Sequence, residues 1–114
     1  MFEVSTEPPD GDVIVVRASG EVDMTVSATF ERSLLEAAAM SRGRRVVVDL
    51  GGLDFLDSSG VHALVKGYHA TNAVGGTLTV RGATGGVARV LYITGVAEVL
   101  GMAVPDQAGE FPGG

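Results

Sequence analysis

The chain has 114 residues, with fourteen acidic against eight basic side chains, a formal net charge of −6 and no cysteine. This length suits one domain that buries a workable core without metals or disulfides, and the lack of cysteine excludes disulfides and thiolate metal sites. The acidic balance argues against direct contact with nucleic acid, which requires a clustered positive surface.

The N-terminal residues predict a β-hairpin rather than a targeting segment. Residues 1–12 lack the basic and apolar regions of a secretory leader, and no apolar run reaches the roughly eighteen residues of a membrane helix. We therefore expect a cytoplasmic protein without a membrane span. Residues 2–6 predict a short strand, residues 7–11 carry a dense turn signal, and the β-branched run 13–18 predicts a second strand that pairs with the first.

The next segment changes from a strand period to a helical one. Asp23 or Thr25 is placed to cap the start of this helix, and Gly43 ends it. Its apolar face is formed by Val26, Phe30, Leu34 and Ala37. The continuous apolar run 45–50 follows, which is typical of a strand buried in a sheet that helices cover.

A second helix, another strand and a third helix complete the ordered part of the chain. The second helix follows residues 57–60 and ends at a pair of glycines. Its apolar face is formed by Val61, Leu64, Val65 and Tyr68. Residues 77–81 predict a strand, and the third helix ends at Gly95. Residues 97–104 are ambiguous and fit a turn followed by a last short strand, and we expect a flexible C-terminal tail from residue 105 to residue 114.

The order of these elements, β-β-α-β-α-β-α, predicts the fold class. Helices that alternate with apolar strands favour an α/β domain with a mixed, mostly parallel β-sheet, an N-terminal hairpin and about three to four packing helices. The sequence has no internal repeat and no visible domain boundary. We therefore expect a single domain over residues 1–104, followed by the tail over residues 105–114.

The turn Asp57-Ser58-Ser59-Gly60 is the strongest candidate for a functional site. In sheets of this kind, functional residues gather where the carboxyl end of a strand leads into a helix. Asp57 or Ser58 can cap the backbone N–H groups of the first helical turn. A phosphate on a first-turn serine would meet the same donors. The turn is also explained as an ordinary helix cap, so its chemistry alone leaves both interpretations open.

Other candidate sites have weaker support. A serine hydrolase would combine Ser59 with His62 or His69, but the G-x-S-x-G elbow is missing and both histidines lie on the same helix. The glycine-rich loop 82–86 lacks the lysine and the spacing of a phosphate-binding loop. Two histidines without cysteine give no credible transition-metal cluster. A solvated turn is expected at the basic cluster Arg42, Arg44 and Arg45.

Three motifs resemble one protein family. Asp57-Ser58-Ser59-Gly60, preceded by Phe55-Leu56 and an apolar strand, resembles the signature of bacterial STAS-domain anti-sigma factor antagonists. Gly20-Glu21-Val22-Asp23 is similar to that family's turn between its early strand and first helix. Residues 87–91, with Thr94-Gly95-Val96, are similar to its last core helix and the stop that follows. The likeness extends over nearly the whole chain in consistent order and spacing.

The resemblance implies a regulatory binding protein rather than an enzyme, with no cofactor or metal. Members of the family bind an anti-sigma factor that is also a serine kinase, and this binding frees the sigma factor. The kinase phosphorylates a serine of the turn, which ends the binding, and a phosphatase reverses the modification. The resemblance implies Ser59 as the phosphorylated residue and Ser58 as a secondary site. The implied partner-binding residues are Asp23, Asp57, Ser58, Ser59 and Gly60.

Alternatives remain at the levels of the residue and of the protein. Asp23 is explained by a helix cap as well as by an interface role. The chain also fits a STAS module of a lipid-transport or stress-sensing complex. A third class is a small-molecule binder that uses the loop 82–86 or the carboxyl edge of the sheet.

Overall fold

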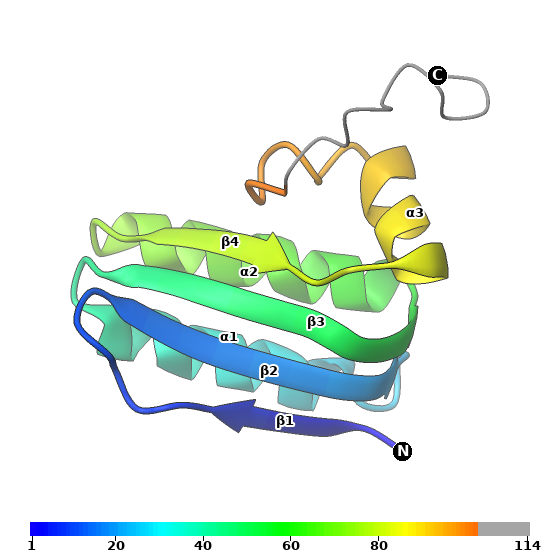
Figure 1. Cartoon of the computed structure of the whole chain (residues 1–114), viewed down its shortest axis with the longest axis horizontal. Helices are drawn as coiled ribbons and strands as arrows, with labels where there is room; N and C mark the ends of the chain where they lie inside the picture. Colours follow the sequence, from blue (N-terminus) through cyan, green and yellow to red (C-terminus); the bar gives the residue numbers. More distant parts are fainter. Residues whose placement is uncertain (103–114) are drawn as a thin grey trace.

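The computed structural model describes residues 1–102, in which four strands and three helices alternate (Figure 1). In chain order they are β1 (Glu3–Thr6), β2 (Val13–Val22), α1 (Ser27–Ser41), β3 (Arg45–Leu56), α2 (Ser58–Ala73), β4 (Thr77–Arg81) and α3 (Gly85–Ile93). This order is the predicted one. The end of the predicted domain at residue 104 and the predicted tail over residues 105–114 lie outside the described residues.

The strands form one mixed sheet in the order β1-β2-β3-β4. β1 pairs with β2 antiparallel, as the predicted hairpin, whereas β2 with β3 and β3 with β4 are parallel pairs. The predicted α/β class with a mostly parallel sheet is therefore confirmed. Because Val22 and Leu56 pair at the ends of β2 and β3, these two strands end side by side at the carboxyl end of the sheet.

β2 and β3 are longer than the sequence predicts. The predicted strands end at residues 18 and 50, whereas β2 continues to Val22 and β3 to Leu56. Glycines at 51 and 52 predict a turn, but pairing with β2 carries the strand through them with a shift of register. A Cβ atom on Gly52 would lie 2.8 Å from the Cβ of Ser19, so glycine allows the close approach of the two strands here.

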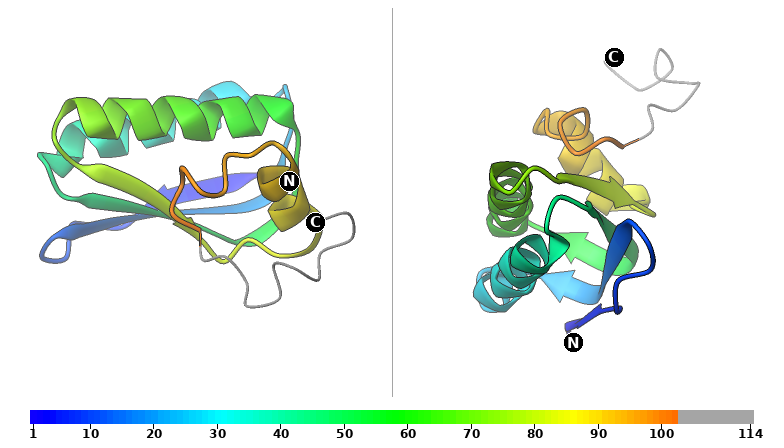
Figure 2. Two further views of the ribbon diagram at one scale, coloured as in Figure 1. Left: turned by 90° about the horizontal axis from the view of Figure 1, so that it is seen from above. Right: turned by 90° about the vertical axis from the view of Figure 1, so that its left-hand side faces the viewer.

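Helices α1 and α2 lie on the same face of the sheet, and α3 lies at the carboxyl end of the sheet, where it contacts β3 (Figure 2). Burying one large apolar side chain contributes roughly 1.5–3 kcal/mol. The core between the two helices and the sheet contains the buried side chains of Ile14, Val16, Phe30, Leu34, Val46, Val48, Leu64 and Leu78. No helix within residues 1–102 has the length and apolarity needed to cross a membrane.

The segment after α3 forms turns rather than a strand. Residues 97–101 are turn residues, and the carbonyl of Leu100 accepts a hydrogen bond from the backbone N–H of Val80 at 2.8 Å. Ala97 and Leu100 are buried, which fixes the segment at the β4 edge of the sheet. The turn expected within residues 97–104 is therefore confirmed, and the expected last strand does not form in this segment up to residue 102. Residues 103 and 104 lie outside the described residues.

Candidate functional site

Asp57 lies between β3 and α2, and its carboxylate caps the helix. The Asp57 backbone is extended, with φ −104° and ψ −173°. The carboxylate oxygen Oδ1 accepts hydrogen bonds from the backbone N–H of Ser59 at 2.9 Å and of Gly60 at 3.3 Å. The predicted cap is confirmed, and Asp57 rather than Ser58 supplies it.

The two serines of the turn differ in their surroundings. Ser58 is exposed, and its hydroxyl has no hydrogen-bond partner among residues 1–102. Ser59 is half-buried, and its Oγ donates a hydrogen bond to Oδ1 of Asp57 at 2.5 Å. The backbone N–H groups of Ser59 and Gly60, which are the donors that a phosphate on a first-turn serine would meet, are already bound to Asp57 in the unmodified chain.

Gly60 fixes how closely the start of α2 approaches the sheet. A Cβ atom at this position would overlap Cδ1 of Leu56 and would lie 2.8 Å from Cγ1 of Val22. Both neighbours are buried, at 2% and 0% exposure. The absence of a side chain at Gly60 therefore lets the helix begin directly against the ends of β2 and β3.

A second turn of the same kind precedes α1. Asp23 follows β2 as Asp57 follows β3, and its Oδ1 accepts hydrogen bonds from the Thr25 hydroxyl at 2.6 Å and the Thr25 backbone N–H at 2.9 Å. These hydrogen bonds hold the pKa of Asp23 below its usual value, and the bond from the Thr25 hydroxyl is the largest cause.

The predicted side-chain cap of α1 by Asp23 or Thr25 is wrong. The helix begins at Ser27, and the cap position is Val26, which offers no polar side chain. The Asp23 carboxylate is engaged by Thr25 one turn earlier, so the helix start depends on the backbone instead. The carbonyl oxygen of Asp23 accepts a hydrogen bond from the N–H of Ser27 at 2.9 Å.

The sheet brings the two turns together. Val22 pairs with Leu56, and the backbone N–H of Asp57 donates to the Val22 carbonyl at 3.2 Å. The turns 23–25 and 57–60 therefore adjoin, and we call them, with the ends of β2 and β3, the carboxyl edge. All five residues singled out by the sequence lie on this edge.

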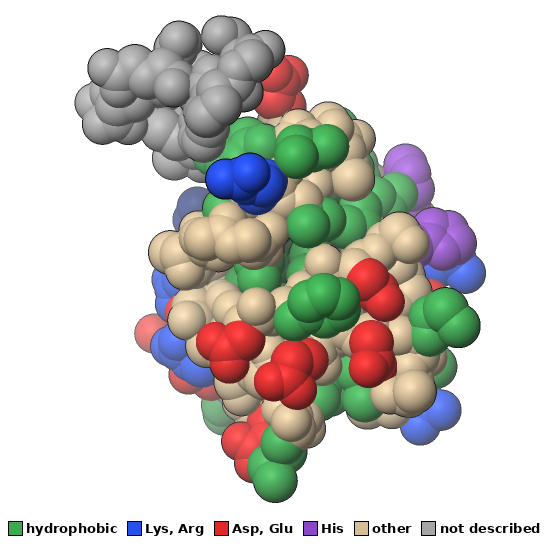
Figure 3. Space-filling model, turned by 90° about the vertical axis from the view of Figure 1, so that its right-hand side faces the viewer, with side chains coloured by type: hydrophobic (Ala, Val, Ile, Leu, Met, Phe, Trp, Pro, Cys, Tyr) green, Lys and Arg blue, Asp and Glu red, His purple; other side chains and the backbone are tan. Residues whose placement is uncertain are grey.

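Acidic and apolar side chains gather on the face of the molecule that holds the carboxyl edge (Figure 3). Met24 is 78% exposed and Phe55 is 49% exposed. The carboxylates of this region belong to Glu21, Asp23, Asp54 and Asp57. The sequence pattern does not single out Met24 and Phe55 as surface residues. A signal was present for Phe55, because it directly precedes Leu56 and two adjacent strand residues point to opposite faces.

The remaining candidates do not assemble into a catalytic or metal site. His62 and His69 are exposed on α2, and the Ser59 hydroxyl is bonded to Asp57 rather than to a histidine. Within residues 1–102, no group of histidine, aspartate and glutamate side chains is placed to hold a metal ion. Part of the loop 82–86 lines a depression of about 420 Å³ beside Tyr92. Of the basic cluster, Arg42 and Arg44 lie in the predicted turn between α1 and β3, and Arg45 is the first residue of β3.

Comparison with known proteins gives a consistent set of relatives. The sequence model of the STAS domain matches residues 5–106. An anti-sigma F factor antagonist from Paenibacillus polymyxa is 31% identical over 88 residues, which cover 77% of this chain and 75% of that protein.

Two solved structures of SpoIIAA resemble the fold. The unphosphorylated anti-sigma factor antagonist has a TM-score of 0.74 at 20% identity, covering 95% of this chain and 94% of that chain. The phosphorylated form, described as a Bacillus cell fate determinant, has a TM-score of 0.67 at 19% identity, covering 95% of this chain and 97% of that chain. At these identities the likeness establishes the fold.

Proposed function

This chain belongs to the STAS domain family, and from that premise we propose that it is an anti-sigma factor antagonist controlled by phosphorylation of Ser59. Its unphosphorylated form binds an anti-sigma factor that is also a serine kinase, and thereby frees the sigma factor. Phosphorylation of Ser59 ends this binding, and a phosphatase restores it. In this role the chain is a regulatory binding protein and not an enzyme.

The position of Ser59 is the observation that carries the proposal. The half-buried hydroxyl lies in the first turn of α2, on the edge that also presents the exposed side chains of Met24 and Phe55. Aromatic residues and methionine are enriched in the cores of protein–protein interfaces. A partner that binds across this edge, over both apolar side chains and the turn 57–60, covers Ser59, and a modified Ser59 then lies inside the interface.

A phosphate on Ser59 changes both the charge and the hydrogen bonds of the edge. It adds about −1.5 to −2 charges and removes the proton that Oγ donates to Asp57. The phosphate oxygens also compete with the Asp57 carboxylate for the backbone N–H groups of Ser59 and Gly60. A partner matched to the unmodified edge loses affinity, and each 1.4 kcal/mol lost is tenfold.

The composition of the edge indicates the chemistry of the partner surface. Four carboxylates, from Glu21, Asp23, Asp54 and Asp57, belong to residues within three positions of Met24 or Phe55 in the chain. A complementary surface carries arginine or lysine around an apolar socket, because complementary potentials steer association and fix the register of docking. The added charge of a phosphate would by itself be attracted to such a basic surface, so release after phosphorylation depends on the altered hydrogen bonds of the turn and on the desolvation and steric cost of a phosphate inside the interface.

Affinity capture from a lysate of the native host tests the proposal. The baits are the wild type, Ser59→Ala, Ser59→Asp and, as a matched control for added charge, Ser58→Asp. We expect an ATP-binding anti-sigma protein on the wild type and Ser59→Ala, strongly reduced on Ser59→Asp and less affected on Ser58→Asp. Mass spectrometry after incubation with ATP should place the phosphate on Ser59.

Two results would count against the proposal. Equal retention of one partner by all four baits would exclude Ser59 as the switch. Recovery of transport components in place of an anti-sigma protein would assign the chain to the STAS modules of transport complexes.

A further inference from the structure

The face of the sheet that α1 and α2 leave uncovered carries an ordered pattern of charge. On β2 and β3, the residues that point to this face include Val15, Arg17, Val47 and Asp49, which are exposed or half-buried. Their neighbours Val16 and Val48 point to the opposite face and are buried in the core. We call the surface formed by the outward-pointing residues of β1, of β2 and β3 as far as Arg17 and Asp49, and of β4 the open face.

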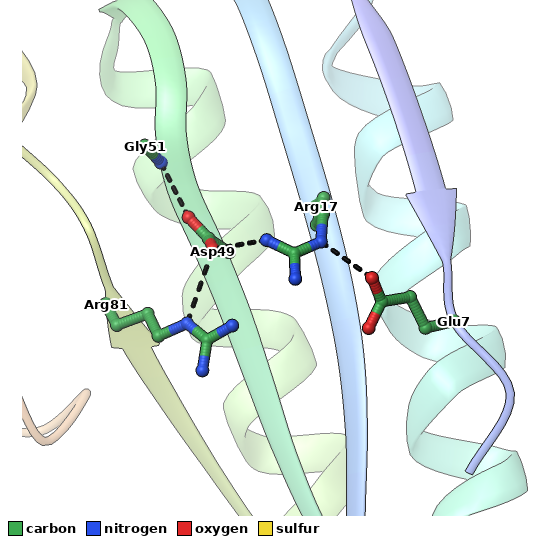
Figure 4. Close-up of polar contacts among 5 residues, drawn as sticks. All are labelled: Glu7, Arg17, Asp49, Gly51 and Arg81. Atoms are coloured by element: carbon green, nitrogen blue, oxygen red, sulfur yellow. Dashed lines mark hydrogen bonds and ion pairs between the residues drawn. The ribbon is translucent and has the colours of Figure 1, made fainter. Parts of the chain in front are cut away.

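Four charged side chains form a row across the open face (Figure 4). Arg17 donates from Nε to Glu7 Oε2 at 2.8 Å and from Nη1 to Asp49 Oδ2 at 2.7 Å, and Arg81 donates from Nε to the same Asp49 oxygen at 3.3 Å. Arg17, Asp49 and Arg81 are register partners on β2, β3 and β4. We call Glu7, Arg17, Asp49 and Arg81 the charge row; its signs alternate as −, +, −, +.

An alternating row of four charges is complementary to its own reverse. If two copies meet face to face about a two-fold axis parallel to the strands, Glu7 lies opposite Arg81 of the other copy, and Arg17 lies opposite Asp49. If the axis is instead perpendicular to the strands, each charge faces its own equivalent, and like charges facing each other are unfavourable. The pattern therefore selects one orientation of the axis.

The apolar residues next to the row are also complementary about a two-fold axis parallel to the strands. Val15 and Val47 are register partners on β2 and β3, one pair along from Arg17 and Asp49. Under the axis parallel to the strands, Val15 of one copy faces Val47 of the other, and the converse contact is equivalent. Sheets that stack in this way keep their strand directions within about 30° of each other.

We propose that the open face is a self-association surface, on which two copies of this chain pair about a two-fold axis parallel to the strands. This inference is independent of the phosphorylation of Ser59. It rests on a pattern that satisfies a two-fold contact in its charged residues and in its apolar residues at once.

The row retains bonding capacity for a second copy. The side chains of Arg17 and Arg81 are 47% and 51% exposed, and that of Glu7 is 45% exposed. Among residues 1–102, the Nη2 atom of Arg17 and both Nη atoms of Arg81 have no hydrogen-bond partner. Asp49 is recessed at 18% exposure between the two arginines, so an arginine of the second copy can reach it from above the sheet.

The size of the surface indicates a weak dimer. Three strands of about five residues, at 3.3 Å rise and 4.8 Å separation, present about 240 Å² in projection. A stable interface buries about 800 Å² on each partner. We therefore expect dissociation constants in the micromolar range or weaker, with affinity that falls as salt screens the charge pairs.

A charge-swap experiment on the full chain tests the proposal. Sedimentation equilibrium is measured over a concentration series for the wild type, Arg17→Asp and Asp49→Arg, each alone, and for an equimolar mixture of the two variants. In either variant alone, like charges face each other twice across the two-fold axis. In the mixture, every position of the row again faces an opposite charge.

We expect each variant alone to self-associate at least tenfold more weakly than the wild type, and the mixture to recover most of the association. Arg32→Asp and Glu36→Arg make the same changes of net charge on the exposed surface of α1, and they should associate like the wild type. Circular dichroism and melting curves establish that each variant is folded. Recovery in the mixture also separates a contact between chains from a loss of stability, because two damaged chains would not repair each other.

Three outcomes would overturn the proposal. The first is a wild type that stays monomeric at every concentration and at low salt. The second is association of the single variants at wild-type strength. The third is a mixture of folded variants that shows no more association than either variant alone.

Discussion

Gly60 provides the most direct test of how the carboxyl edge is built. Replacing Gly60 with alanine adds one methyl group where Cδ1 of Leu56 and Cγ1 of Val22 already lie. Both neighbours are almost fully buried, so neither can swing into solvent. Overpacking of this kind costs typically about 1–3 kcal/mol. Alanine in place of glycine within a helix recovers about 0.5–1 kcal/mol, so we expect a net loss of about 1–2 kcal/mol.

Gly86 is the matched control for this substitution. It lies in α3, and a Cβ atom built there meets nothing within 4 Å. Gly86→Ala should therefore leave the stability unchanged or raise it by up to about 1 kcal/mol. Urea unfolding followed by circular dichroism measures both changes, and the melting temperature of Gly60→Ala should fall by about 4–8 °C. A Gly60→Ala protein as stable as the wild type would refute the close-approach argument.

Two further substitutions test the cap and the charge row. Asp57→Ala should lower the unfolding free energy by about 1 kcal/mol. Asp57→Asn should lower it less, because the amide keeps an acceptor for the N–H groups of Ser59 and Gly60. Equal urea midpoints for the wild type and Asp57→Ala would contradict the cap. The pKa of Asp49 lies below its usual value. The largest cause is the hydrogen bond from the Gly51 N–H to its carboxylate, and the positive charges of Arg81 and Arg17 add to it. Because the folded-state pKa is lowered, this stabilisation is complete above the ordinary aspartate pKa of about 4 and is lost as the pH falls through the folded value. In Asp49→Asn the unfolding free energy should therefore depend less on pH in the acid range, and identical pH profiles for the two proteins would contradict the assignment.

The elements of the fold follow from local patterns in the sequence. The β-branched run after residue 12 and the helical spacing of Phe30 and Leu34 each specify one element with little help from tertiary contacts. The Asp57 cap is also local, because its carboxylate reaches only two and three residues ahead. For these features the sequence pattern and the structure agree.

The features that the sequence did not predict depend on pairing between distant segments. Gly51-Gly52 carries an ordinary turn signal, and only the pairing of β3 with β2 keeps these residues in a strand. Asp23 has the residue type of a helix cap, but the Thr25 hydroxyl and N–H engage its carboxylate before the helix begins. The charge row draws its members from four separate segments, so it becomes visible only once the strand register is known.

The register also determines how the two surfaces relate to each other. Arg17 lies five residues before the end of β2 at Val22, and Asp49 lies seven residues before the end of β3 at Leu56. Because Arg17 pairs with Asp49 and Val22 pairs with Leu56, the two additional residues of β3 are accommodated by the register shifts, and at about 3.3 Å per residue the charge row lies about 16 Å from the ends of both strands. Pairing through the charge row therefore leaves the carboxyl edge, with Ser59, free to meet a partner.

The orientation of the proposed two-fold axis has a consequence for binding. An axis parallel to the strands preserves their direction, so both carboxyl edges of a dimer point the same way. Two Ser59 turns would then face one partner assembly from the same side. If that assembly has two equivalent docking sites, the second contact forms at the effective concentration set by the first, which raises the overall affinity without any new contact. Weak pairing through the open face would then amplify the effect of one phosphate, because modification of either copy leaves only a single contact.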